Sequence, residues 1–475
     1  MLLPTLLFAL QPRSPQDLID AALAAMGGRE KLASISTVKA QVVGHQFMPE
    51  QSERPEGPWF NVYFDGTETA DFTKGTDTWS VKARGVLFNP PSDQNATFDL
   101  AAGKQNGFVY PISMSATAQR MALGPENVLF TASVAKDLKV GDDTVFHDVP
   151  QEVLTFSWGG SPVRVLLNRY THLPSAVEVK HEGQGFWAVW GDVTDRTVWG
   201  NWDFAMGGIY YPTLWAREHN DLQQDNITLS GLEVTYGAAR DAAWGESIAR
   251  LNTGAPRPFT FKPVEIAPGV VQYQSGFNCA VADQGDGLVL LEGVVSSEYV
   301  KKIEEDIRTR FPGKKIKAVV TTDDAWPHIG GLRQMVAEGV TIYALPQNRK
   351  ILDRLFKSPH TIHPDDLQLH HRAPNYKLVS ERVVLGSGAN RLEVYPVHGA
   401  GTERMLFAYF PEKKIAYAPD VIQVGQGQWF SVNILSEFVD AVNREGLKPE
   451  SAFAFHSGLR PFQTLRDKVN ETRAK

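Results

Sequence analysis

Hydrophobic residues near the start of the chain recur at the spacing of a helix. Ser14 is placed to cap such a helix, Pro15 suits its first turn, and Asp17 stands where a capping box has its acid. Gly27 is placed to end it. The apolar residues that would share one face are Leu18, Ile19, Ala22, Leu23 and Met26. The pattern therefore predicts a helix over residues 15–26.

The pattern changes to short alternating apolar stretches between about residues 38 and 234. Examples are SAVEVKHEG and NITLSGLEVTYG, bounded by Gly, Pro, Asn and Asp, which is typical of antiparallel strands. Nine of the eleven tryptophans lie between Trp59 and Trp244. Two interpretations fit this density: a concave sheet that holds an apolar ligand, or tryptophans that fill the core of a curved sheet.

A Pro-rich stretch, NTGAPRPFTFKPVEIAPG, separates this region from one in which helices and strands alternate. In the second region IKAVVTT is continuously apolar, as expected for a strand covered on both faces. The sequence therefore predicts a two-domain α+β protein. A β-rich domain with a leading helix and a Trp-rich curved sheet occupies residues 14–251, a linker residues 252–263, and a second domain residues 264–475.

The composition is that of a globular protein without a basic surface. The 475 residues carry a net charge of −7, so nucleic acid is not an expected partner. The single cysteine, Cys279, lies in an apolar run and excludes an internal disulfide. No stretch is long and apolar enough to predict a transmembrane span.

The first residues, MLLPTLLFALQ, resemble the apolar part of a secretory signal without its basic start. Residues 1–13 are therefore interpreted as a truncated signal segment. This interpretation predicts a periplasmic or envelope-associated protein. If the apolar run is not a signal, the cytoplasm is expected instead.

The stretch VVTTDDAWPHIGG, Val319 to Gly331, predicts a strand, a loop and a helix. Three later strands each end in a ligand-type residue: VYPVH in His398, KKIAYAPD in Asp420, and AFAFH in His456. In this order the four segments resemble the metallo-β-lactamase fold superfamily, whose signature at the first place is T-H-x-H-x-D-H-x-G-G. The resemblance covers residues 264–475 and implies an αββα sandwich.

The signature is degenerate in this chain. Its first histidine corresponds to Asp323, its second to Ala325 and its aspartate to Pro327, so only His328 remains. Alanine cannot bind a metal, and proline offers neither a side-chain ligand nor an N–H. The two-zinc centre that the resemblance implies would thus lack several ligands.

A single zinc or iron ion is the metal site that the resemblance still implies. His328, Asp420 and His456 form a two-histidine, one-carboxylate set. The ligand candidates are His328, His398, Asp420, His456 and Asp323. A metal-activated water would attack an ester, lactone, amide or phosphoester, with Asp323 or Asp324 as general base. Glu292, at a strand end in the same domain, is a further source of a missing ligand.

Other interpretations of the same residues remain open. Asp323, Asp324 and His328 can satisfy backbone groups at a helix start, and His398 and His456 can be hydrogen-bonded pocket residues. On that view the second domain is a metal-free pseudoenzyme. The hydrolase hypothesis predicts a small-molecule or lipid-like substrate, and the alternative predicts an envelope protein that binds lipids or other hydrophobic ligands.

The first domain carries a resemblance of its own. A leading helix, SPQDLIDAALAAMGG, followed by a Trp-rich antiparallel sheet, is similar to the outer-membrane lipoprotein-sorting (lipoprotein-carrier) fold. That fold is a half-barrel around an apolar cavity of lipid size. The resemblance implies that this domain binds an acyl chain or docks on the envelope.

Overall fold

The structure is a computed structural model of the whole chain, and it describes most of the residues. The predicted signal segment, except for Arg13, and most of the predicted linker lie outside the described residues. The described ranges are 13–48, 59–85, 88–110, 112–183, 189–205, 208–252, 260–425 and 428–474.

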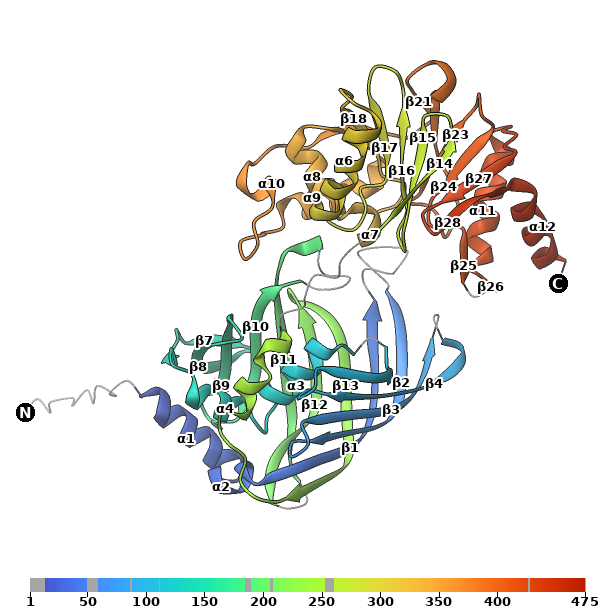
Figure 1. The fold of residues 1–475 in the computed structure, drawn as a ribbon. Helices are drawn as coiled ribbons and strands as arrows, with labels where there is room; N and C mark the ends of the chain where they lie inside the picture. Colours follow the sequence, from blue (N-terminus) through green and yellow to red (C-terminus); the bar gives the residue numbers. More distant parts are fainter. Residues whose placement is uncertain are drawn as a thin grey trace, which may run out of the picture. The chain divides into compact units, whose positions relative to one another are not determined.

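The chain divides into two compact units (Figure 1). Unit 1 comprises Met1–Met48, Phe60–His181 and Val193–Pro256. Unit 2 comprises Pro49–Trp59, Glu182–Asp192 and Arg257–Lys475. Each unit therefore combines segments that are separated in the sequence, whereas the predicted domains were continuous.

Unit 1 is built from one large sheet with a few helices. Its helices are α1 (Pro15–Met26), α2 (Arg29–Ala33), α3 (Met114–Leu123), α4 (Val128–Val134), α5 (Trp244–Ser247) and the 3-10 turn η3 (Ala249–Asn252). Its strands are β1 (Ile35–Met48), β2 (Phe60–Asp71), β3 (Thr76–Gly85), β4 (Phe88–Asp99), β5 (Lys104–Phe108), β6 (Lys139–Val140), β7 (Thr144–Phe146), β8 (Val149–Trp158), β9 (Ser161–Asn168), β10 (Pro174–Glu182), β11 (Asp192–Ala205), β12 (Ile209–His219) and β13 (Leu222–Tyr236).

The predicted capping of α1 is confirmed. The Ser14 hydroxyl accepts a hydrogen bond from the backbone N–H of Asp17 at 3.1 Å, and the Asp17 carboxylate accepts one from the N–H of Ser14 at 2.9 Å. The predicted face is also the buried one: Leu18, Ile19, Ala22, Leu23 and Met26.

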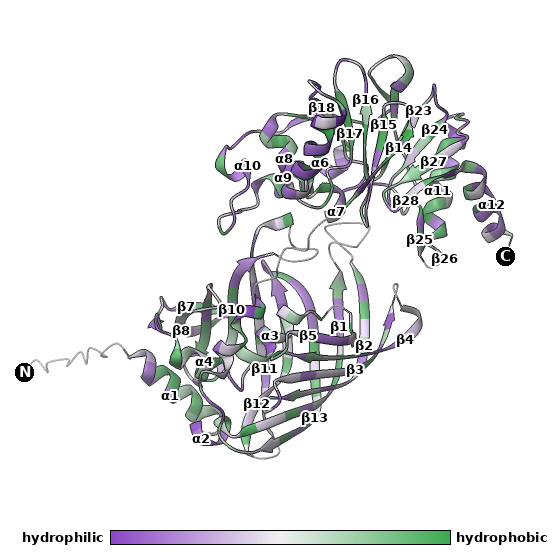
Figure 2. Ribbon diagram, in the orientation of Figure 1, coloured by the Kyte–Doolittle hydropathy of each residue, from purple (hydrophilic) through white to green (hydrophobic). Residues whose placement is uncertain are grey.

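The sheet of unit 1 has 13 strands, in the order β5-β4-β3-β2-β1-β13-β12-β11-β10-β9-β8-β6, with β7 on β8. Buried and exposed residues alternate along strands such as β3 and β9, and hydrophobic and hydrophilic residues alternate along the strands in Figure 2. One apolar core joins residues of the sheet to residues of α1, α3 and α4.

The tryptophans of unit 1 support the packing interpretation. Trp79, Trp158, Trp199 and Trp215 are all buried members of the core. A cavity beside Trp79 has a volume of about 10 Å³, which is the room of about one water molecule. This cavity is far too small for an acyl chain.

Unit 2 contains two main sheets, a small sheet of β25 and β26, and several helices. Its helices are α6 (Ser297–Arg310), α7 (Trp326–Ile329), α8 (Leu332–Glu338), η4 (Pro346–Asn348), α9 (Arg349–Lys357), α10 (Asp366–Leu369), η5 (Gly388–Asn390), α11 (Val432–Arg444) and α12 (Phe462–Arg473). Its strands are β14 (Lys262–Ala267), β15 (Val270–Gln274), β16 (Cys279–Asp283), β17 (Leu288–Leu291), β18 (Ile316–Val320), β19 (Thr341–Ala344), β20 (Asn375–Leu378), β21 (Val383–Leu385), β22 (Leu392–Pro396), β23 (Leu406–Phe410), β24 (Ile415–Ala418), β25 (Gln423–Gly425), β26 (Gln428–Phe430), β27 (Ser451–Ala454) and β28 (Ser457–Pro461).

The two main sheets of unit 2 pack face to face. One runs β14-β15-β16-β17-β18-β19-β20 and the other β21-β22-β23-β24-β27-β28. One core lies between them and joins residues of both sheets. A second core lies between the latter sheet and the helices α11 and α12, while α6, α8 and α9 flank the first sheet (Figure 1). The layers therefore follow the order helix, sheet, sheet, helix.

Of the connection between β10 and β11, the described residues 183 and 189–191 belong to unit 2, as does Asp192 at the start of β11. The Asp192 carboxylate accepts hydrogen bonds from the N–H groups of Thr361 and Ile362 at 3.0 and 3.1 Å. Trp190 is buried, and the Arg354 guanidinium lies 3.7 Å from the centre of its ring. This short segment is therefore a structural part of unit 2.

The burial of the single cysteine and the lack of a long apolar helix among the described residues agree with the sequence patterns. Cys279 is buried, and burial and the charge of Glu292 raise the pKa of its thiol above its usual range. Among the described residues, no helix has the length and hydrophobicity needed to cross a membrane.

Candidate functional site

Most of the candidate side chains lie at the ends of parallel strands of unit 2. Glu292 follows β17 and Asp323 follows β18, and these two strands pair in parallel. Asp420 follows β24 and His456 follows β27, which form a second parallel pair. The carboxyl ends of parallel strands meet at one edge of a sheet, which is where α/β folds form their pockets.

The degenerate signature folds into a tight turn that begins α7. Asp323 is buried, and its Oδ1 accepts a hydrogen bond from the N–H of Ala325 at 2.9 Å. The Thr321 hydroxyl donates to the backbone carbonyl of Asp323 at 2.8 Å. Pro327 lies in the first turn of α7, where a missing N–H has no cost. Asp323 thus has the structural role expected of a carboxylate before a helix.

Asp324 is held by an arginine. The Nε of Arg404 donates to Oδ2 of Asp324 at 2.6 Å, and both side chains are largely buried. The same guanidinium donates to the carbonyl of Gln347 at 2.8 Å. Because its charge is already paired, Asp324 is a weaker candidate for a general base than Asp323.

His328 is fully buried beside Glu292. The Nδ1 of His328 lies 3.3 Å from Oε1 of Glu292, and both side chains have no exposed surface. Glu292 also accepts hydrogen bonds from the hydroxyl of Thr322 and, at 3.4 Å, from that of Tyr417. Neither ring nitrogen of His328 makes a well-formed hydrogen bond to a described residue.

Asp420 and His456 form the second pair of the site. The Nε2 of His456 lies 3.3 Å from Oδ1 of Asp420. The other ring nitrogen, Nδ1, is 2.9 Å from the carbonyl oxygen of Gly276, so it is placed to donate a hydrogen bond there. Oδ1 of Asp420 is buried and has no hydrogen-bond partner among the described residues.

Aromatic rings lie against the two histidines. The ring of Phe455 stacks on that of His328, with 3.6 Å between centres and 22° between planes. Phe277 contacts Phe455 at 5.6 Å and His456 at 5.8 Å. Trp326, in the altered signature, meets Phe277 edge to face at 5.5 Å. His328 is fully buried behind these rings, whereas the side chain of His456 keeps 31% of its surface exposed.

The site places opposite charges close together in this low-dielectric surrounding. Burial alone would lower the pKa of His328, but Glu292, Asp323 and Asp420 outweigh it and raise that pKa to about 9. Burial raises the pKa of Asp420 to about 6. Burial and the charge of His328 lower the pKa of His456 to about 4, so its imidazole is neutral at pH 7.

His398 differs from the other candidates in its exposure and in its backbone. Its side chain is exposed, and its backbone has a φ of 59°, a left-handed conformation that is uncommon outside glycine. It makes no hydrogen bond or ion pair with another described residue. The structure therefore brings Asp323, His328, Asp420 and His456 together, and His398 makes no contact with them among the interactions described.

The chemistry of the gathered residues fits one metal ion better than two. Two imidazoles and a carboxylate offer nitrogen and oxygen donors, and the buried Oδ1 of Asp420 lacks a partner. Asp420 and His456 face each other at 3.3 Å, the same separation as that of Glu292 and His328. Across the described ranges, no three His, Cys, Asp or Glu side chains are placed where they could hold a metal ion.

The two glycines of the signature are needed for space. A Cβ on Gly330 would lie 2.0 Å from the carbonyl oxygen of Val295, and one on Gly331 would lie 2.2 Å from a methyl group of Val300. The φ of Gly330 is −57°, which any residue can adopt. Close packing, not backbone freedom, thus explains the Gly-Gly pair and fixes the helix that follows His328.

Sequence reasoning missed two residues of the site. Arg404 follows its partner Asp324 by 80 positions, and no local pattern links the two. Phe455 immediately precedes His456, so a search for apolar residues next to the candidate ligands would have found it.

No protein-family model and no curated protein matches the chain. The solved structures similar to it include the DIM-1 metallo-β-lactamase, at 13% identity and a TM-score of 0.35, over 44% of this chain and 95% of that one. A metallo-β-lactamase from Pontibacter korlensis has 15% identity and a TM-score of 0.36, over 45% of this chain and 100% of that one. FIM-1 from Pseudomonas aeruginosa, in its mono-zinc form, has 13% identity and a TM-score of 0.35, over 45% of this chain and 96% of that one.

Proposed function

We propose that unit 2 is a hydrolase that uses one divalent metal ion, zinc or iron, for which Asp420 and His456 would supply the first two protein ligands. The observation that carries the proposal is the pair formed by Nε2 of His456 and Oδ1 of Asp420, 3.3 Å apart. A buried carboxylate oxygen without a hydrogen-bond partner is costly, and a cation would satisfy it. The Gly276 carbonyl holds the other nitrogen of His456, as the outer-shell partner of a ligating histidine does.

The surrounding residues have distinct roles in this proposal. Glu292 forms an ion pair with His328 and holds its imidazole beside the pair of Asp420 and His456. Asp323 accepts a proton, because burial raises the pKa of its carboxyl above its usual range. When bound, the metal makes a coordinated water acidic enough to act as a nucleophile. The aromatic wall of Phe277 and Phe455 favours a substrate with an apolar part.

The substrate class follows from this chemistry. An activated water attacks an electrophilic carbonyl or phosphorus centre, so the candidates are esters, lactones, amides and phosphoesters. Asp324 is not given a catalytic role, because Arg404 already neutralises its charge. His398, which is exposed and makes no ion pair with the other candidates, is not given a role as a ligand.

A metal-free binding function is the second candidate. It is favoured by the ring of Phe455 stacked on His328 and by the carboxylate of Glu292 at its Nδ1. In this arrangement a protonated His328 supplies the positive charge that the buried carboxylates need, and no metal is required. Unit 2 would then bind a small molecule without hydrolysing it.

Metal content separates the two candidates. The full chain, purified without an affinity tag, is analysed by plasma emission spectrometry before and after incubation with zinc and removal of excess metal. The Asp420→Asn/His456→Ala variant removes the proposed pair, and Asp366→Asn/His370→Ala is a matched control on α10. Circular dichroism establishes that both variants fold.

We expect about one metal ion per chain in the wild type and the control, and none in the site variant. Metal that persists in the site variant would place the ion elsewhere and contradict the proposal. A wild type that takes up no zinc or iron would exclude the metal-dependent hydrolase and leave the second candidate. Only the first result justifies screening the four substrate classes.

A further inference from the structure

Two segments of unit 2 border the pair of Asp420 and His456. The side-chain amide of Gln423, the first residue of β25, donates to the carbonyl oxygen of Asp420 at 3.1 Å. On the other side of the pair, β28 begins with Ser457, which directly follows His456. The hairpin of β25 and β26 and the edge strand β28 therefore both start at the candidate site.

Arg460 connects these two segments. Its Nε donates to the hydroxyl of Ser457 at 2.8 Å, and its guanidinium lies 5.4 Å from the centre of the Trp429 ring. Trp429 belongs to β26, and Figure 1 shows β25 and β26 next to β28. Because Arg460 follows Ser457 by three positions on β28, this hydrogen bond directs its side chain back along the strand toward His456.

No carboxylate neutralises Arg460 among the described residues. The guanidinium takes part in no ion pair with them, and its hydrogen bond to Ser457 uses Nε alone. The described part of the chain therefore leaves Nη1 and Nη2 unused. The side chain is only partly buried, so a ligand can approach these nitrogens from solvent.

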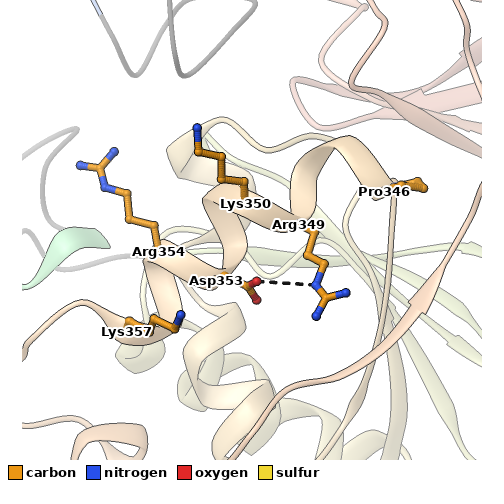
Figure 3. A pocket seen from close by; sticks show the side chains of 6 residues that line it. All are labelled: Pro346, Arg349, Lys350, Asp353, Arg354 and Lys357. Atoms are coloured by element: carbon orange, nitrogen blue, oxygen red, sulfur yellow. Dashed lines mark ion pairs between the residues drawn. The ribbon is translucent and has the colours of Figure 1, made fainter.

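An arginine on α9 shows the more usual arrangement. The guanidinium of Arg349 lies 5.6 Å from the centre of the Tyr376 ring, and its Nε lies 3.6 Å from Oδ2 of Asp353 (Figure 3). Arg349 thus has both an aromatic ring and an acid beside it. Arg460 has the ring without the acid.

The chemistry of the two unused nitrogens favours a carboxylate. Nη1 and Nη2 lie in one plane and can donate two parallel hydrogen bonds to the two carboxylate oxygens. Stacking on Trp429 covers a face of the guanidinium and leaves this edge available. A single arginine balances the charge of a carboxylate, whereas a phosphate monoester carries nearly twice that charge at neutral pH.

The contacts of Arg460 also prepare it for binding. Ser457 and Trp429 restrict the side chain before any ligand arrives. Such ordering reduces the entropy that a ligand must offset.

We propose that Arg460 binds a carboxylate group of the ligand that occupies the pair of Asp420 and His456. This inference rests on the location of the proposed site, but it does not require a bound metal. Arg460 forms no ion pair with Asp420 in the described part of the chain, so the ligand reaches from the pair to the guanidinium. Among the four proposed substrate classes, compounds that also carry a carboxylate are therefore preferred.

The test compares two probes of the same size. 2-Naphthoate carries a carboxylate on an apolar ring system, and 2-naphthamide carries an uncharged amide on the same rings. Isothermal titration of the full chain at neutral pH measures the Kd of each probe. Arg460→Gln removes the charge, and Arg460→Lys keeps the charge without the planar group. Arg349→Gln is the matched control, because its guanidinium also stacks on a ring but is already paired with an acid.

We expect 2-naphthoate to bind the wild type and the control equally, and to bind Arg460→Gln about tenfold or more weakly. Arg460→Lys should show an intermediate loss, because a lysine donates as a point charge. The Kd of 2-naphthamide should be higher than that of 2-naphthoate in the wild type and should not change in Arg460→Gln. Circular dichroism establishes that the variants fold.

Three results would overturn the proposal. The first is that 2-naphthoate does not bind the wild type. The second is that Arg460→Gln and Arg349→Gln lose affinity equally, which would indicate a general effect of charge. The third is that Asp420→Asn/His456→Ala abolishes the binding while Arg460→Gln does not, which would place the carboxylate at the pair itself.

The metal-dependent hydrolase and the role of Arg460 can fail separately. The titrations are repeated after treatment with a chelator, and the metal content is measured in parallel. Binding that depends on Arg460 in a chain that takes up no metal would exclude the hydrolase and support this inference. Binding that is independent of Arg460 in a chain that holds one metal ion would support the metal site and overturn this inference.

Discussion

The carboxylate of Glu292 lies 3.3 Å from Nδ1 of His328, and neither side chain is exposed to solvent. Glu292 adopts a φ of 76°, a left-handed conformation that is uncommon for a residue with a side chain. Its N–H donates to the carbonyl of Val320 at 2.9 Å, and Thr322 and Tyr417 bind its carboxylate. Several contacts thus hold this carboxylate against the histidine.

Replacing Glu292 by Gln should destabilise unit 2. The change removes the closest negative charge from the buried His328, and breaking a buried ion pair by removing one partner costs about 3–5 kcal/mol. Hydrogen exchange of the β17 and β18 amides measures the loss. Glu298→Gln, at an exposed position of α6, is the control and should change the stability by less than about 0.5 kcal/mol. Equal protection of these amides from hydrogen exchange in both variants would show that the pair of Glu292 and His328 does not stabilise unit 2.

The ion pair between Asp324 and Arg404 should have a structural role. Asp324→Asn and Arg404→Gln are each expected to lower the free energy of unfolding by about 2 kcal/mol, because each leaves a largely buried partner charge unpaired. The double variant should lose less than the sum of the two. Urea denaturation of the four proteins gives the coupling energy. Additive losses, together with a selective loss of activity in Asp324→Asn, would instead favour a catalytic Asp324.

Gly330→Ala should destabilise the turn that carries His328. The added methyl group would meet the carbonyl oxygen of Val295 at 2.0 Å, so the backbone must shift. Overpacking of this kind costs about 1–3 kcal/mol. Gly276→Ala is a suitable control, because a Cβ there meets nothing within 4 Å. Thermal unfolding of the two variants tests the difference, and equal midpoints would contradict the packing explanation.

Unit 1 should lose stability as the pH rises toward 8, because of Asp77. Burial and the charge of Glu68 raise the pKa of Asp77 to about 8, from 3.8. Between these two pH values the folded state holds a proton that the unfolded state has released, so the free energy of unfolding decreases as the pH rises. Asp77→Asn cannot titrate and keeps an acceptor for the Trp79 indole, which now donates to Asp77 at 2.9 Å.

The urea midpoint of this Asp77→Asn variant should therefore vary less between pH 4 and 8 than that of the wild type. Asp137→Asn is the control, because Asp137 is exposed and hydrogen bonds from Ser157 lower its pKa. The urea midpoint of this control should vary with pH between 4 and 8 as much as that of the wild type. Parallel profiles of the wild type and Asp77→Asn would contradict the raised pKa.

The predictions that succeeded rest on local chemistry. Ser14, Pro15 and Asp17 specify the start of α1 within four residues, and their contacts form as predicted. A local cap of the same kind begins α6, where the Ser296 hydroxyl accepts a hydrogen bond from the N–H of Tyr299 at 3.2 Å. Period-two and continuous apolar patterns likewise indicated strands, because burial on one or both faces of a sheet dictates them.

The geometry of the candidate site could not be predicted in the same way. The contact of Glu292 with Thr322 spans 30 positions, and that of Arg404 with Asp324 spans 80. Such pairs are created by the packing of strands, and no sequence period encodes them. The ends of predicted strands located Asp420 and His456. The left-handed backbone of His398, by contrast, is not predicted by any sequence pattern.

The segment 182–192 determines whether unit 2 can be expressed as a separate fragment. A fragment that begins after the Pro-rich stretch would contain both sheets of unit 2 but would lack Trp190 and Asp192. Arg354 would lose the ring that it stacks on, and the N–H groups of Thr361 and Ile362 would lose their acceptor. Unit 2 is therefore encoded in separate pieces, and recombination at the linker would not transfer it whole.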